Sequence, residues 1–225
     1  MWCLCLALGM GPTGSLGDKE PPEEPHLEEA LQYVNAAITT EKPSIAITFD
    51  DGPSASWTPV LLEGLRERGI KATFFLIGQN VEKNQDLVRK MSEEGHLIGN
   101  HTYHHVEITK IGNAEAYEEI RSTSELIFGI TGSYTEYMRP PFGLWQKGME
   151  EKLDTIPVLW TIDPLDWTTE NVDEIVNKVV TEVEEGDIIL LHDCYKSSVE
   201  AAFRIIDVLQ AEGYEFVTVD QLILN

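Results

Sequence analysis

The sequence alternates between short apolar runs and longer amphipathic stretches from about residue 43 onward. The runs that predict strands are Ile45–Phe49, Ala72–Ile77, Leu97–Gly99, Glu136–Arg139, Val158–Ile162, Asp187–Leu191 and Glu215–Val219. The stretches that predict helices are Thr58–Arg68, Val81–Glu94, Ala114–Ile130, Gln146–Leu153, Val172–Glu184 and Val199–Glu212. Strands that alternate with helices indicate parallel βαβ units, which build either a barrel or an open doubly wound sheet. No phosphate-binding glycine motif follows the first strand, which argues against a nucleotide-binding fold.

The chain is expected to have two parts. Residues 43–225 are predicted to form one α/β domain, and residues 1–42 to supply a leader, a linker and a short helix. Met1–Met10 is apolar and resembles the end of a secretory signal, although no Lys or Arg precedes it. This segment is far shorter than the ~20 residues that cross a bilayer, so we expect no stable membrane insertion. A signal remnant, a gene-start artefact and a structural segment are alternative interpretations.

Charge narrows the range of partners. The chain has 16 Lys and Arg residues against 39 Asp and Glu residues, a net charge of −23. Such a surface repels phosphate backbones and anionic membranes, so we expect no nucleic-acid partner. A neutral or cationic substrate would be tolerated, and nothing in the sequence predicts a protein partner. The three cysteines are too few for a disulfide scaffold.

Reactive side chains follow five of the predicted strands. The carboxyl ends of parallel strands meet at one edge of an α/β fold, where function gathers. The segments at these ends are Asp50–Gly52, His101–His105, Arg139–Gly143, Asp163–Trp167 and His192–Asp193. We therefore expect them to form one site. Asp193 is interpreted either as a residue that orients His192 or as the start of a loop.

The spacing of the histidines favours a metal site. His101 and His105 are four residues apart, and a helical turn would place both imidazoles on one face. Two neutral imidazoles and one carboxylate make a three-ligand set for a catalytic divalent metal, with positions left open for water and substrate. His104 is an alternative to His105. Asp50 and His192 have the chemical types of a general base and a general acid, but spacing alone does not assign these roles.

Five motifs, in order, resemble those of the polysaccharide deacetylases, carbohydrate esterase family 4. They are TFDDG at 48–52, HTYHH at 101–105, RPPFG at 139–143, DPLDW at 163–167 and LLH at 190–192. Their order and spacing match the family over nearly all of residues 43–222. The resemblance implies a distorted (β/α) barrel with about seven parallel strands. It also implies metal-dependent removal of acetyl groups from carbohydrate.

The resemblance also implies roles for the most reactive residues. Asp51, His101 and His105 are similar to the family's metal ligands. Asp50 is similar to the general base that deprotonates the attacking water, and His192 to the general acid. The metal would be a single divalent ion, with zinc preferred and cobalt or nickel also permitted by this ligand set.

Further roles follow for the residues around them. Arg139 is similar to the arginine that orients the base, and Asp166 to a carboxylate that either tunes the acid or holds Arg139. Trp167 and Leu190 resemble walls that seat the acetyl methyl group. Because the two prolines after Arg139 have no N–H, Phe142 is the first residue there able to donate a backbone hydrogen bond to an oxyanion, an interaction worth ~3 kcal/mol.

These inferences predict hydrolysis of N-acetyl groups on N-acetylglucosamine (GlcNAc) residues of an acetylated glycan, with release of acetate. Peptidoglycan is preferred because 213–219 and the DPLDW segment resemble bacterial cell-wall deacetylases, and chitin oligosaccharides share the acetamido group. An acetylxylan esterase is one alternative, and a glycan-binding module that keeps a structural metal is another. Phosphodiester chemistry would call for a second metal or a basic clamp. We expect an extracellular or cell-surface location in a bacterium.

Overall fold

The computed structural model describes residues 42–149 and 153–224. These residues belong to one compact unit, Lys42–Asn225. The leader, the linker and the short helix expected before residue 42 lie outside the described residues. No helix in the described part of the chain is long and apolar enough to cross a membrane.

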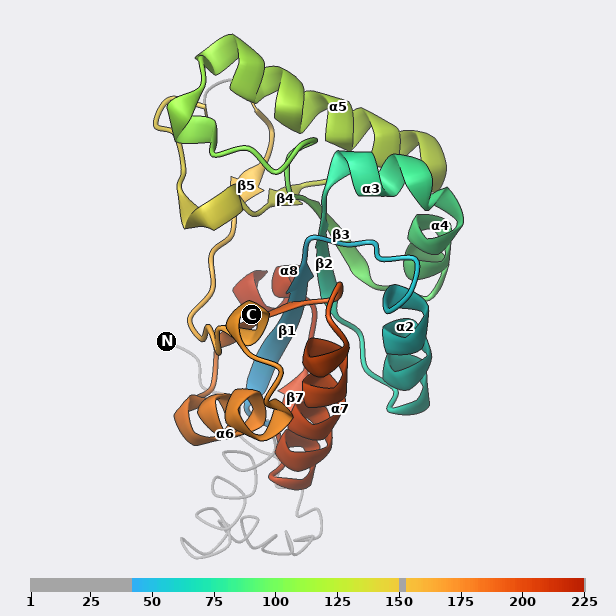
Figure 1. Ribbon diagram of the computed structural model, residues 1–225, viewed down its shortest axis with the longest axis vertical. Helices are drawn as coiled ribbons and strands as arrows, with labels where there is room; N and C mark the ends of the chain where they lie inside the picture. The colour runs from blue at the N-terminus through green and yellow to red at the C-terminus, as the bar shows by residue number, and fades with distance from the viewer. Residues whose placement is uncertain (1–41, 150–152, 225) are drawn as a thin grey trace, which may run out of the picture. The chain divides into compact units, whose positions relative to one another are not determined.

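Seven parallel strands form the centre of the unit, in the order β5-β4-β3-β2-β1-β6, with β7 also paired to β1 (Figure 1). They are β1 (Ser44–Asp50), β2 (Thr73–Leu76), β3 (Leu97–Asn100), β4 (Tyr137–Met138), β5 (Ile156–Pro157), β6 (Ile188–His192) and β7 (Glu215–Phe216). Each lies at or beside a predicted strand. All the pairs are parallel, as the alternation with helices predicts.

Helices surround these strands in Figure 1. They are α2 (Thr58–Glu67), α3 (Gly78–Lys83), α4 (Gln85–Glu93), α5 (Asn113–Thr131), α6 (Val172–Glu182), α7 (Lys196–Ala211) and α8 (Val219–Leu224), with short 3₁₀ turns η1 (Ile108–Lys110), η2 (Pro141–Gly143) and η3 (Asp166–Thr168). The predicted helix Val81–Glu94 is wrong in one respect, because Asn84 has non-helical angles (φ −133°, ψ 43°) and divides it. The helix expected from Gln146 does not form in its described part, and α8 was not predicted.

The residues of β1 alternate between two faces, as a strand requires. Ile45, Ile47 and Phe49 are fully buried in the main core, which joins the strands to the helices. Ala46 belongs instead to a smaller cluster with residues of β2, β4 and α8. Asp50 shares the parity of Ala46, so the strand directs its carboxylate to the inside of the curled sheet.

The segment after β5 closes the curled sheet. The predicted strand Val158–Ile162 is reduced to a single parallel bridge between Ile162 and Ile189 of β6, with Leu190 N donating to Ile162 O at 3.0 Å. Val158 O and Leu159 O instead accept hydrogen bonds from the Arg139 side chain, which removes them from any strand ladder. This closure confirms the expected distorted barrel.

Candidate metal and catalytic site

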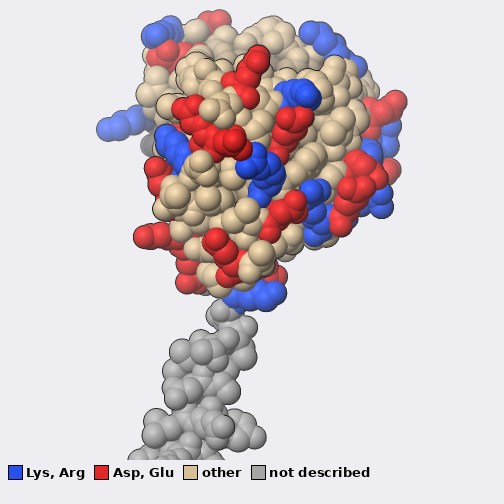
Figure 2. Space-filling model, turned by 60° about the horizontal axis from the view of Figure 1, so that its bottom comes forward, with Lys and Arg blue, Asp and Glu red and all other residues tan. Residues whose placement is uncertain are grey.

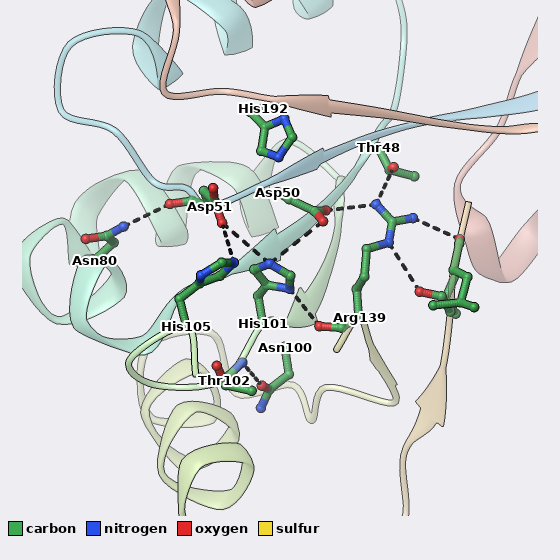
Figure 3. Close-up of polar contacts among 12 residues, drawn as sticks. Thr48, Asp50, Asp51, Asn80, Asn100, His101, Thr102, His105, Arg139 and His192 are labelled. Atoms are coloured by element: carbon green, nitrogen blue, oxygen red, sulfur yellow. Dashed lines mark hydrogen bonds and ion pairs between the residues drawn. The ribbon is translucent and has the colours of Figure 1, made fainter. Parts of the chain in front are cut away.

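Three predicted ligands converge at the carboxyl edge of the sheet. Asp51 follows β1, and His101 and His105 lie in the loop after β3. One ligand atom from each residue lies within 4.8 Å of the other two. Asp51 Oδ1 is 3.4 Å from the Nε2 atoms of both histidines. Dashed lines mark these two contacts in Figure 3.

The chemistry of this triad fits a divalent cation. Asp51 Oδ1 is buried and has no hydrogen-bond partner, which is costly for a carboxylate oxygen. His101 Nδ1 lies 2.6 Å from Arg139 O, so Nδ1 carries the hydrogen and the Nε2 lone pair faces Asp51. A carboxylate and an imidazole lone pair that face each other repel unless a cation lies between them.

Electrostatics favour the ligating forms of two of these residues. Burial by itself raises the pKa of Asp51, but contact with His101 and the charges of the neighbouring histidines outweigh it and lower that pKa below its ordinary value. Burial lowers the pKa of His105, against the opposing effect of Asp51. Asp51 is therefore favoured as a carboxylate and His105 as a neutral imidazole, the states that bind metal.

The loop that carries the two histidines is not helical. Thr102 and His105 have positive φ angles of 62° and 58°, so the helical turn expected for His101 and His105 does not form. All the non-glycine residues with positive φ in the described chain belong to loops around this site, the others being Asp51, Phe142 and Leu165. Such angles persist only where surrounding contacts enforce them, and they cluster at functional sites.

Glu119 of α5 enforces this conformation, a role that no local sequence signal revealed. Its Oε2 accepts hydrogen bonds from the backbone N–H groups of Tyr103 and His104, at 3.0 and 2.8 Å. Its Oε1 lies 2.7 Å from His104 Nδ1. Asn100 adds a bond from Thr102 N to its Oδ1 at 2.8 Å. The pairing with Glu119 takes His104 away from the cavity, so the structure places His105 and not His104 at the triad.

Asp50 lies beside the triad and is paired with a buried arginine. Arg139 Nη1 is 2.8 Å from Asp50 Oδ1 and donates to Thr48 Oγ1 at 2.7 Å. The guanidinium is fully buried, with its carbon 4.2 Å from the centroid of the Phe75 ring. Burial lowers the pKa of Arg139 and the charge of Asp50 opposes this shift. Arginine stays protonated in such surroundings, so Asp50 has a permanent counter-charge.

His192 faces the same cavity from β6 and is held by Asp166. Its Nδ1 is 2.8 Å from Asp166 Oδ1, and its backbone N–H donates to Asp166 Oδ2 at 2.9 Å. Burial by itself lowers the pKa of His192, but the hydrogen bond and charge of Asp166, with the charges of Asp50 and Asp51, raise it to about 9. Of the two expected partners of Asp166, His192 and Arg139, the structure shows hydrogen bonds with His192.

These groups share one cavity of ≈ 410 Å³. Its lining residues are Asp50, Asp51, His101, His105, Phe142, Trp160, Asp163, Trp167, Leu190, His192 and Tyr195. Trp167 is 56% exposed, so it is a wall of the cavity rather than part of the core. Trp160 and Tyr195 were not predicted. Asp163 Oδ1 accepts a hydrogen bond from Leu165 N at 2.8 Å, as expected for a turn cap.

Comparison with known proteins identifies the family of this chain. The family model described as polysaccharide deacetylase matches residues 37–158. The chain belongs to the polysaccharide deacetylase family. Among curated members, it is 39% identical over 178 residues to the peptidoglycan-N-acetylglucosamine deacetylase PgdA of Listeria monocytogenes, covering 79% of this chain. It spans only 38% of the length of that relative.

Two further members of the polysaccharide deacetylase family cover similar shares of the chain. A peptidoglycan-N-acetylglucosamine deacetylase of Bacillus cereus is 36% identical over 191 residues, which cover 80% of this chain and 68% of the relative. The solved structure of the peptidoglycan deacetylase PdaC from Bacillus subtilis has a TM-score of 0.79 and 36% identity, covering 81% of this chain and 90% of that chain. The distorted barrel is therefore a shared fold of this family.

Proposed function

We propose that this chain is a metal-dependent hydrolase that removes N-acetyl groups from GlcNAc residues of a polysaccharide, with peptidoglycan as the preferred polymer. The observation that carries the proposal is the placement of Asp50 and His192 in one cavity with the three-ligand triad. Each of the two has its own buried partner, Arg139 and Asp166 respectively. The names of the relatives support the choice of polymer.

The triad would hold one divalent ion, for which zinc is the first choice. Two imidazoles and one carboxylate are a common catalytic zinc set, and cobalt or nickel fits the same ligands. Such an ion would act as a Lewis acid on the acetyl carbonyl and would lower the pKa of a water to about 7.

Asp50 then accepts a proton from the attacking water. Arg139 occupies Asp50 Oδ1, while Asp50 Oδ2 lies 3.8 Å from His101 Nε2, at the triad. The carboxylate is therefore fixed in direction by a partner that does not titrate. Because Arg139 binds Asp50 Oδ1, Asp50 Oδ2 is the oxygen that would accept the proton.

Phe142 and His192 act on the carbonyl oxygen and on the leaving nitrogen. The Phe142 N–H would stabilise the developing oxyanion, since neither proline before it has an N–H to offer. Because His192 Nδ1 is bonded to Asp166, Nε2 is the atom that would protonate the leaving amine. Its raised pKa keeps this imidazole charged at neutral pH. The products are acetate and a free glucosamine, and Trp167 and Leu190 would seat the acetyl methyl group.

The surface charge disfavours a polyanionic substrate. On the face seen in Figure 2, acidic and basic side chains are interspersed, and no continuous basic stripe crosses it. The net charge of −23 disfavours a polyphosphate. Since peptidoglycan lies outside the cell membrane, we propose that the protein acts in the extracellular space or at the cell surface.

The test is acetate release from three substrates in parallel: GlcNAc oligomers, peptidoglycan and acetylated xylan. Each is assayed after chelation and after zinc, cobalt or nickel is added back. We expect metal-restored release from the two GlcNAc polymers, with peptidoglycan the better substrate. Release from xylan alone would make the protein an acetylxylan esterase. Glycan binding without release from any substrate would make it a binding module.

A further inference from the structure

Asp193 is a fully buried carboxyl group that the proposed chemistry does not use. It follows His192 directly, and its side chain is 0% exposed. Thr58 Oγ1 donates a hydrogen bond to its Oδ2, while its Oδ1 has no hydrogen-bond partner. No hydrogen bond or ion pair joins the Asp193 carboxyl to the His192 ring among the described residues, so the group does not orient His192 directly.

The hydrogen bond of the Asp193 carboxyl and its close approach to Gly52 both involve the segment that leads from Asp51 into α2. Thr58 is the first residue of α2, and its hydroxyl also accepts a hydrogen bond from Ser54 N at 2.7 Å. A Cβ added to Gly52 would lie 2.5 Å from both carboxylate oxygens of Asp193, so the backbone beside Asp51 rests directly on this group. The β1–β6 register sets Asp50 opposite His192, which brings the two following residues together.

A buried carboxyl group with an unpartnered oxygen lowers the stability of the folded protein. The Asp193 carboxyl is such a group, and it also lies close enough to Asp51 to interact with its charge. Burial raises the pKa of Asp193 to about 7, with the charge of Asp51 acting in the same direction. Asn80 Nδ2 holds Asp51 O at 2.8 Å from the α3 side. The segment from Asp51 to Thr58 is therefore held at one end by Asn80 and at the other by Asp193.

We propose that Asp193 is a positioning residue that holds Thr58 and Gly52 and thereby sets the affinity of the Asp51–His101–His105 site for a divalent metal. The proposal rests on the metal site of the proposed function. It gives a reason why a glycine follows Asp51, because a larger residue would collide with the group that anchors the loop. Through its contact with Thr58, Asp193 also connects the segment that follows Asp51 to the end of the strand that bears His192.

Competition with a chromophoric chelator measures the zinc affinity of the intact protein and its variants. Asp193→Ala and Thr58→Val each remove the hydrogen bond from Thr58 Oγ1 to Asp193 and are each expected to weaken zinc binding about tenfold, the lower end of the range for lost outer contacts of a metal site. Because both remove the same contact, the double variant should be no weaker than the weaker single. Thr58→Ser keeps the hydroxyl and should bind like the wild type.

Ser198→Ala is the matched control, because Ser198 is also fully buried and its hydroxyl has no hydrogen-bond partner. Thermal unfolding of the metal-free proteins separates positioning from general stability. Wild-type affinity in Asp193→Ala and Thr58→Val, or affinity loss shared by Ser198→Ala, would overturn the proposal. If the wild type itself binds no zinc, the metal site fails as well, and the two failures are thereby told apart.

Gly52→Ala gives a second, independent measurement. In the wild-type background the added methyl group meets the Asp193 carboxylate, so zinc affinity should fall to a similar extent. In an Asp193→Ala background the three atoms nearest to the added methyl group are gone, and the same substitution should change the affinity little further. Equal effects of Gly52→Ala in both backgrounds would show that Asp193 does not set the loop.

Discussion

Asp50 and His192 lie on two sides of one cavity, and each is paired with a residue of the opposite charge. Asp50 is a carboxylate whose counter-charge is a fully buried arginine, fixed by Thr48 and by the carbonyls of two residues after β5. His192 is an imidazole whose counter-charge is a buried carboxylate, and 13% of its own side chain stays exposed. The partner of Asp50 is an arginine, which does not titrate. His192, by contrast, is itself a titrating group.

This difference suits the two to opposite directions of proton transfer. A base must present an oxygen to the substrate water in a fixed direction, and Arg139 orients Asp50 without itself exchanging protons. An acid must hold a proton and then release it, which requires a pKa that the surroundings raise and a reachable nitrogen. The comparison therefore predicts that substitutions on the two sides will differ in their dependence on substrate and on pH.

The largest expected effect is on the Asp50 side. Asp50→Asn keeps the shape of the side chain but cannot accept a proton, so acetate release should fall by about 10³-fold, within the usual range for general bases. The loss should be the same for an acetamide and for an acetyl ester, because both reactions need an activated water. Turnover is measured at saturating zinc, with thermal unfolding as the control for folding. Activity retained in this variant would remove Asp50 from its proposed role.

On the His192 side the effect should depend on the leaving group. His192→Ala should lower hydrolysis of a GlcNAc acetamide by about 10²-fold, since an amine leaves only when protonated. An alkoxide is a better leaving group, so the loss on an acetyl ester should be clearly smaller. Paired assays of both substrates with one enzyme preparation make the comparison. Equal losses would mean that His192 is not the general acid.

The ends of the strands made much of this site predictable from the sequence. Asp50 and His192 end paired strands, and the family motifs assigned the groups around them. The conformation of 101–105 was not predictable, because its positive φ angles depend on Glu119, a residue of α5 with no motif of its own. Strand β5 was misplaced for a similar reason, since carbonyls in that segment bind the Arg139 side chain. Long-range contacts overrode local pattern in both cases.

The pH dependence of stability tests the His192–Asp166 pair by itself. The folded-state pKa of about 9 lies above the ordinary 6.5, so the pair's contribution is fully present below pH 6.5 and is lost as pH rises towards 9. Over this window the free energy of unfolding of the metal-free wild type should fall more than that of Asp166→Asn, in which the largest of the interactions that raise this pKa is weakened. Urea unfolding at a series of pH values measures the difference. Parallel curves for the two proteins would show that Asp166 does not hold the proton on His192.

The smallest effect is expected outside both sides, at the loop that carries the two histidine ligands. Glu119→Ala removes the carboxylate oxygen that accepts both the Tyr103 and the His104 backbone N–H groups, so zinc affinity should weaken by about tenfold. Turnover at saturating zinc should change little, because no hydrogen bond or ion pair joins Glu119 to Asp50 or to His192 among the described residues. Glu118→Ala is the control, since Glu118 is paired with Arg121 on the exposed face of the same helix. Equal affinities in the two variants would mean that the histidine loop keeps its shape without Glu119.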